Sequence, residues 1–188
     1  MANHMAKLEH LWQKAVITIF ALATIVIVIG FFLPDNLVIP VRGATKADWN
    51  AKSFWFSPWG KSGVHKGIDI FAKEGTPVIA ACSGPVVSVE SNRDGGNVVS
   101  ILGPKWRVHY YAHLKTLKVV SGDFVQQGAE IGTVGTTGNA VGKAPHLHYA
   151  IITQIPYVWE FRTDKYGFDR MFFLNPNEKL SHGIGRNN

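Results

Sequence analysis

The sequence predicts an all-β domain, either a sandwich or a barrel, preceded by one N-terminal transmembrane helix. Two observations predict this fold class. From about His65 onward, short apolar segments alternate with glycine-containing turns at regular spacing, and no long amphipathic helix follows residue 34. Before that region, residues 15–33 form one apolar run without a charged side chain.

Size and charge limit the function classes. The 188 residues suffice for one domain plus a short appendage, and 46% of them are hydrophobic. The net charge of +6 favours acidic polymers or lipid surfaces as partners, or serves solubility alone. No nucleic acid is expected, because no run of Lys and Arg is interleaved with aromatic residues. The oligomeric state is not predicted.

The apolar run at residues 15–33 is predicted to be a membrane anchor. At about 1.5 Å per residue it spans roughly 28 Å, close to the thickness of a bilayer's hydrocarbon core. A cleaved signal peptide is the rival, with a cleavage site near Ala21 and Ala23, but the apolar run continues beyond that site. A buried core helix would carry a polar face, which this segment lacks.

The expected topology is single-pass, with residues 1–14 as a cytoplasmic tail. Similar numbers of basic residues flank the helix on its two sides, so the positive-inside rule does not decide its orientation. The short N-terminal tail favours an N-inside orientation. Residues 34–58 are expected to form a connector, residues 59–180 the domain and residues 181–188 a flexible tail.

The domain's strands are predicted from apolar segments between turns. The predicted strands cover residues 78–81, 86–89, 97–102, 106–113, 124–125, 131–134 and 146–152. The lone cysteine, Cys82, adjoins the first of them and is expected to fill the core rather than to act as a nucleophile. The aromatic cluster at residues 54–59 is expected either to pack on a strand edge or to line a groove.

Histidines and one aspartate recur at spacings that share a strand face. His65 and Asp69 lie four residues apart in an extended or turning segment. His146 and His148 lie on one strand face, about 6.6–7 Å apart along the backbone. The same alternation predicts that His113 shares a face with the residues at 109 and 111.

These residue types favour a catalytic zinc site. Zinc binds His nitrogen and Asp oxygen well, and a catalytic site keeps one position open beside three protein ligands. A structural site uses four ligands, usually with several cysteines, and this chain has one cysteine. Each motif alone is a weak signal, but several motifs in one small β domain make a purely structural role for these residues much less plausible.

The chain resembles the M23 family of metallopeptidases, the lysostaphin/LytM-type endopeptidases. That family's pattern reads H-x-x-x-D, then Y-x-H-L, then H-x-H. Here the pattern falls at residues 65–69, 111–114 and 146–148, and the resemblance covers about residues 60–152. It implies a two-layer antiparallel β sandwich, LytM-like and of the barrel-sandwich-hybrid type.

The resemblance also implies roles for five residues. His65, Asp69 and His148 would bind one zinc ion, while His113 and His146 would move protons, in an order that the sequence leaves open. The stretch before His65 lacks the arginine and tyrosine of many family members, which leaves the transition-state contacts open.

The implied activity is hydrolysis of peptide cross-links in bacterial peptidoglycan. The implied place is the cytoplasmic membrane, with the domain on the periplasmic or extracellular side. One alternative is a non-catalytic LytM-like module that binds the wall or activates another hydrolase. The other is a biotinyl- or lipoyl-type carrier, which the turn at residues 122–128 resembles, although no modifiable lysine motif is present.

Overall fold

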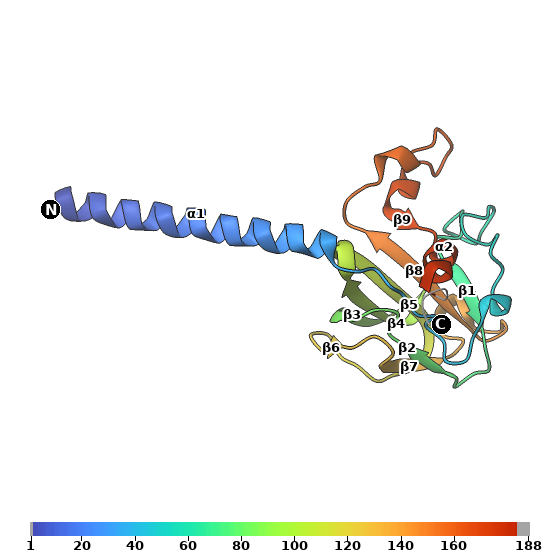
Figure 1. The fold of residues 1–188 in the computed structure, drawn as a ribbon. Helices are drawn as coiled ribbons and strands as arrows, with labels where there is room; N and C mark the ends of the chain where they lie inside the picture. The colour runs from blue at the N-terminus through green and yellow to red at the C-terminus, as the bar shows by residue number, and fades with distance from the viewer. Residues whose placement is uncertain (1, 184–188) are drawn as a thin grey trace. The chain divides into compact units, whose positions relative to one another are not determined.

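The structure is a computed structural model that describes residues 2–183, with side chains described for residues 10–180. The chain divides between Pro34 and Asp35 into two compact units. The first is the helix α1, Ala2–Phe32, drawn in blue in Figure 1. The second holds the strands.

Helix α1 is long and apolar enough to cross a membrane. The segment His10–Phe32 is 23 residues long, and its most apolar 18-residue stretch has a mean hydropathy of 2.8. Only 6% of that segment's most apolar part is buried, which does not fit a core helix. The helix begins well before residue 15, because good helix formers such as Ala6, Lys7 and Leu8 extend it.

The second unit is an antiparallel β structure, as predicted. The strands of the described residues are β1 (Ile68–Phe71), β2 (Pro77–Ile79), β3 (Gly84–Asn92), β4 (Gly96–Gly103), β5 (Arg107–Leu117), β6 (Phe124–Val125), β7 (Glu130–Val134), β8 (His146–Thr153) and β9 (Phe173–Leu174). Every pairing between these strands is antiparallel. The strands predicted from the sequence are all present, with slightly shifted ends.

Strand β5 joins the two layers of the fold. Strands β1, β8, β5, β4, β3 and β6 follow one another in the larger sheet, while β7 pairs with both β2 and the second half of β5. The core lies between these layers, where Tyr111, Leu147 and Ile131 are fully buried. The predicted two-layer sandwich is therefore confirmed, and Figure 1 shows β2 and β7 together at one side of it.

Residues 35–58 differ from the expected connector. Leu37, Val41 and Trp49 are buried in the core, with at most 5% of each exposed. The backbone of residues 38–42 also runs beside β2, where the Arg42 nitrogen donates to the Pro77 oxygen at 3.0 Å. This segment covers the edge of β2, which would otherwise be unpaired. The compact domain therefore begins at Asp35 rather than at residue 59.

The helical segments after α1 are short. The 3₁₀ turns are η1 (Lys46–Asp48), η2 (Pro104–Trp106), η3 (Gly138–Ala140), η4 (Val158–Glu160) and η5 (Asp169–Phe172), and the last helix is α2 (Pro176–Gly183). Helix α2 includes the first three residues of the expected tail, and residues 184–188 lie outside the described part. As predicted, no long amphipathic helix occurs in the described residues after 34.

Cys82 is core filler, as predicted. Its side chain is 2% exposed, and burial raises the pKa of the thiol to about 12, helped by Asp35 nearby. A buried, protonated thiol of this kind is unreactive.

Candidate metal centre and groove

Pairing between β1 and β8 brings the predicted zinc ligands together. Asp69 lies directly opposite His148 in the register of these strands, and His65 lies three residues before Ile68, where β1 begins. Gly67 lets the segment pack this closely. A Cβ atom at Gly67 would lie 2.5 Å from the Tyr149 carbonyl oxygen and 2.9 Å from the His148 ring. A larger residue would therefore push β1 away from β8.

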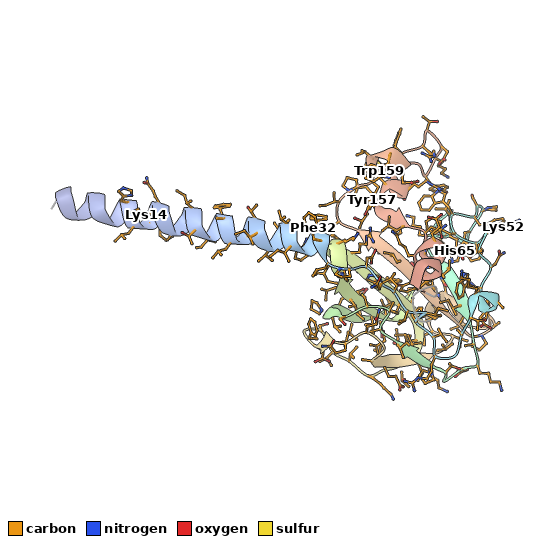
Figure 2. The ribbon with its side chains drawn as sticks, viewed as in Figure 1. Lys14, Phe32, Lys52, His65, Tyr157 and Trp159 are labelled. Carbon is orange, nitrogen blue, oxygen red and sulfur yellow. The ribbon has the colours of Figure 1, made fainter. Side chains whose placement is uncertain are left out.

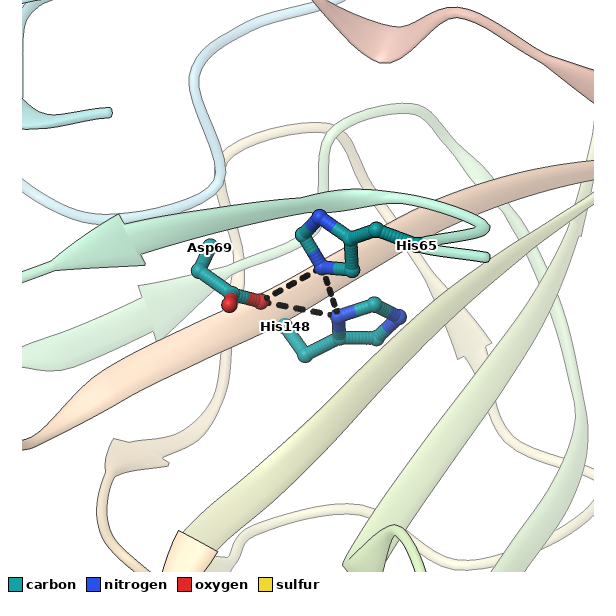
Figure 3. A group of neighbouring side chains, drawn as sticks. All are labelled: His65, Asp69 and His148. Carbon is teal, nitrogen blue, oxygen red and sulfur yellow. Dashed lines mark hydrogen bonds and ion pairs between the residues drawn. The ribbon is translucent and has the colours of Figure 1, made fainter. Parts of the chain in front are cut away.

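Three ligand atoms converge at this point, as Figure 3 shows. His65 Nε2 lies 3.1 Å from Asp69 Oδ1 and 3.1 Å from His148 Nδ1. His148 Nδ1 lies 2.9 Å from Asp69 Oδ1. These atoms belong to the group in the described residues that could hold a metal ion.

The donor set fits one zinc ion. Ligands about 2.0–2.1 Å from a tetrahedral zinc lie about 3.3 Å from one another. The three separations observed here fall just below that value. His65 Nδ1 lies 3.1 Å from the Ser53 carbonyl oxygen, to which it donates in the neutral ring. Its Nε2 lone pair then faces Asp69 and His148, as a metal ligand requires.

Asp69 carries negative charge in this cluster. Burial by itself would raise the pKa of the carboxyl, but the adjacent His148 and His65 rings lower it by more. The pKa of Asp69 therefore lies well below its ordinary value. One carboxylate between two imidazoles is a ligand set that zinc accepts readily.

Two further histidines lie beside this cluster, and in each of them Nδ1 is hydrogen-bonded to a backbone carbonyl. His113 Nδ1 is 2.9 Å from the Thr137 carbonyl oxygen, and His146 Nδ1 is 2.7 Å from the Ala144 carbonyl oxygen. Donation from each Nδ1 leaves each Nε2 able to accept a proton. The two rings are 5.0 Å apart between centroids.

His113 is neutral at pH 7. Burial, together with the neighbouring His148 and His146 rings, lowers the pKa of its ring to about 4. The side chain is 6% exposed. His146 also lies beside the cluster, with its Nε2 4.0 Å from Asp69 Oδ1.

The prediction that His113 shares a face with His109 and Tyr111 is wrong. His109 and Tyr111 are fully buried on the core side of β5, whereas His113 lines the groove. His113 has a φ of 65°, in the left-handed region, and this breaks the alternation of the strand. The prediction for β8 is confirmed, because His146 and His148 both line the groove while the alternate residues Leu147, Tyr149 and Ile151 face the core.

A glycine turn holds His113 in this conformation. The His113 nitrogen donates to the Gly95 oxygen at 2.8 Å. Gly96 has a φ of 66°, and a Cβ atom there would lie 2.2 Å from the Thr137 hydroxyl oxygen. Only glycine allows this approach, which also places the Thr137 carbonyl against the His113 ring.

All five predicted site residues line one groove of about 860 Å³. Trp59 stacks on His65, with 4.0 Å between ring centroids and 22° between ring planes. Phe173 of β9 also lines the groove. The aromatic cluster is thus divided, since Trp59 borders the groove while Phe54 packs on the core. The segment after residue 152 borders the groove as well.

Several contributors were not recognisable from sequence. The carbonyl oxygens that orient the histidines come from Ser53, Thr137 and Ala144, and a backbone carbonyl leaves no mark on residue type. Trp59 was visible only as a member of an aromatic cluster. Its spacing from His65 gave no sign that the two rings stack.

Comparison with known proteins decides the family. The model of peptidase family M23 matches residues 63–158, about half of the chain and the part that carries all five site residues. The chain belongs to peptidase family M23.

Curated M23 relatives include peptidoglycan endopeptidases. The L-Ala–D-Glu endopeptidase of Bacillus subtilis is 36% identical over 122 residues, which is 60% of this chain and 36% of that protein. The peptidoglycan DD-endopeptidase ShyC of Vibrio cholerae is 40% identical over 93 residues, 50% of this chain and 21% of that protein. The chain therefore spans about a fifth to a third of the length of these relatives.

Solved M23 structures share the fold. The catalytic domain of lysostaphin from Staphylococcus simulans superposes with a TM-score of 0.57 at 30% identity. The match covers 69% of this chain and 89% of that domain. Lysostaphin is described there as an antimicrobial peptidase. The predicted resemblance to the lysostaphin/LytM type is confirmed.

Proposed function

We propose that this chain is a zinc metalloendopeptidase that hydrolyses peptide cross-links of bacterial peptidoglycan. The observation that carries the proposal is the convergence of five side chains in one groove. Three offer ligand atoms within 4.8 Å of one another, and two histidines with engaged Nδ1 atoms lie beside them. A non-catalytic module would have no need for both sets.

His65, Asp69 and His148 would hold one zinc ion. Zinc bound there would supply Lewis-acid activation of water and of the scissile carbonyl. Two neutral imidazoles and one carboxylate leave a net charge of about +1 at a divalent ion, which suits a transition state that develops negative charge. The Ser53 carbonyl fixes the His65 ring for this task.

His113 and His146 would move the protons. In each ring the Nδ1–H group donates to a backbone carbonyl, so the Nε2 atom is left to accept a proton. One of them would accept the proton of the attacking water, and a histidine would return a proton to the leaving amine. Trp59 and Phe173 form apolar sides of the groove along which an extended wall peptide could lie.

The substrate class is tested with purified peptidoglycan. We expect the protein to release peptide fragments with new amino termini and no new reducing sugar ends. The control is His146→Ala, which should release few fragments. Sugar release with intact peptides would overturn the peptidase proposal, and wall binding without any cleavage would favour the non-catalytic module.

We also propose that α1 anchors the chain in the cytoplasmic membrane, with the domain outside. The support is its 23-residue apolar segment together with wall-degrading relatives. The proposed parts are a cytoplasmic tail at 1–14, a membrane span at 15–33 and the peptidase domain beyond.

Carbonate washing and external protease test this topology. The full-length protein is expected to stay with the membrane through the wash, while its domain is degraded by protease added outside. An engineered protease site at Lys14 should remain protected. A soluble extracellular product lacking residues 1–23 would instead establish a cleaved signal peptide.

A further inference from the structure

Residues 154–174 form an excursion that mostly lies beyond the M23 match. The Tyr157 nitrogen donates to the Met171 oxygen at 2.9 Å, and the Arg162 nitrogen donates to the Gly167 oxygen at 3.4 Å. The segment therefore folds back on itself, with η4 packed against η5. Backbone hydrogen bonds hold these turns together around the buried side chain of Met171.

This excursion exposes large apolar side chains. The four that define the apolar patch are Val158 (65% exposed), Trp159 (68%), Phe161 (48%) and Phe168 (62%). None of the four lines the catalytic groove, and Figure 2 shows Trp159 apart from His65. Four such side chains within eleven residues mark an interaction surface, because soluble surfaces rarely concentrate them.

The patch lies close to the point where the domain joins the helix. Asp35, the first residue of the domain, forms a buried ion pair with Arg107. Arg107 Nη2 donates to the Tyr157 hydroxyl at 2.6 Å. The Tyr157 ring meets the Trp159 ring edge-on, with centroids 4.9 Å apart. Two side chains thus connect Asp35 with the patch.

The covalent chain keeps Asp35 near the end of α1. Three residue steps separate it from Phe32, the last helical residue, and three extended steps span at most about 11 Å. If α1 spans a bilayer, Asp35 lies within that distance of the membrane surface, whatever the domain's orientation. The patch is therefore within reach of lipid.

The chemistry of the patch suits a lipid interface. Tryptophan and tyrosine concentrate at the level of lipid headgroups, where an apolar ring and a polar atom are both accommodated. Residues 154–174 carry three acidic and three basic side chains, so the excursion has no net charge. Its affinity would come from apolar area, with little contribution from anionic lipid.

We propose that this apolar patch docks on the outer surface of the membrane that α1 crosses. The bilayer interface is its occupant, and docking holds the domain in a fixed orientation on the lipid. This proposal rests on the proposed membrane anchor. It assigns a function to four side chains that the peptidase chemistry does not use.

The test places a dye in the patch of the full-length protein. Val158→Cys is labelled with an environment-sensitive dye and reconstituted into phosphatidylcholine vesicles. Cys82 is buried, so the introduced thiol takes the label, and the unsubstituted protein controls for this. Quenching by a lipid-attached quencher is compared with quenching by iodide in the water.

Val141→Cys is the matched control. Val141 is 73% exposed, against 65% for Val158. It follows η3, which bonds to the turn before β4 through the Asn139 nitrogen and Asp94 oxygen at 3.0 Å. That turn lies at the opposite end of β4 from Gly103, the partner of Arg107, about 23 Å away along the strand.

We expect the dye at 158 to be quenched from the lipid and shielded from iodide, and the dye at 141 to behave the opposite way. High salt should not change this pattern, and Trp159→Ala combined with Phe161→Ala should weaken the lipid quenching at 158.

If the protein floats with the vesicles but iodide quenches both dyes equally, docking is overturned while the membrane anchor stands. If neither quencher reaches the dye at 158, the patch contacts protein rather than lipid, and docking on the membrane is overturned. If the protein does not float, the anchor is overturned, and docking with it.

Discussion

Replacing His148 with alanine is expected to remove both the zinc and the activity. His148 Nδ1 lies 2.9 Å from Asp69 Oδ1 and 3.1 Å from His65 Nε2, so it supplies one of three convergent ligand atoms. Two protein ligands hold zinc far more weakly than three, and the Lewis acid is lost with the ion. Elemental analysis of the folded variant should find little metal, and peptidoglycan turnover should vanish.

His146→Ala is the control on the same strand face. His146 Nδ1 is hydrogen-bonded to the Ala144 carbonyl, and His146 is not one of the three proposed ligands. We expect this variant to keep its zinc and to lose about 10²–10⁴-fold in turnover, the usual contribution of general acid–base catalysis. If His146→Ala loses the metal while His148→Ala keeps it, the two roles are reversed. If neither change affects metal or turnover, the enzyme proposal fails.

Arg107→Ala is expected to cost about 3–5 kcal/mol of unfolding free energy, because it leaves the buried Asp35 carboxylate without its partner. The side chains of Arg107 and Asp35 are only 5% and 9% exposed. The variant also loses the hydrogen bond to the Tyr157 hydroxyl. Urea unfolding followed by tryptophan fluorescence measures the loss.

Arg42→Ala provides the comparison for that loss. Arg42 pairs with Glu130 at 4.0 Å, but its side chain is 59% exposed. Solvent-exposed pairs contribute about 0–1 kcal/mol, so this variant should unfold almost as the parent does. Equal, small losses in the two variants would show that the Arg107 pair is not desolvated.

The alternation of side chains along a strand predicts correctly which face each residue of β8 occupies, but it fails for β5. In β8 every residue from His146 to Thr153 keeps the extended conformation, so the two-residue period assigns each side chain to the correct face. In β5 the left-handed residue His113 shifts the register. That shift depends on the glycine turn at 95–96, which lies far from His113 in sequence, so periodicity within β5 could not reveal it.

The domain boundary was misplaced for a related reason. Proline, glycine and aspartate in residues 34–58 are typical of a connector, and local composition gave no sign of burial. Leu37, Val41 and Trp49 are buried only because the edge of β2 lies beside them in the folded chain. The five proposed site residues, by contrast, do come together in one groove, and the motifs shared with the M23 family had already identified them in the sequence.

The short link between α1 and the domain determines where the groove can work. If α1 lies in a bilayer, only Leu33 and Pro34 separate the helix from Asp35. The ion pair with Arg107 holds Asp35 against β5. A domain of this length has a radius of gyration of about 15 Å, so the groove stays within roughly 50 Å of the lipid. A peptidase anchored in this way would search for its substrate in two dimensions. Its rate would follow the number of molecules per area of membrane and the amount of wall polymer in that thin layer, and polymer farther out would be beyond its reach.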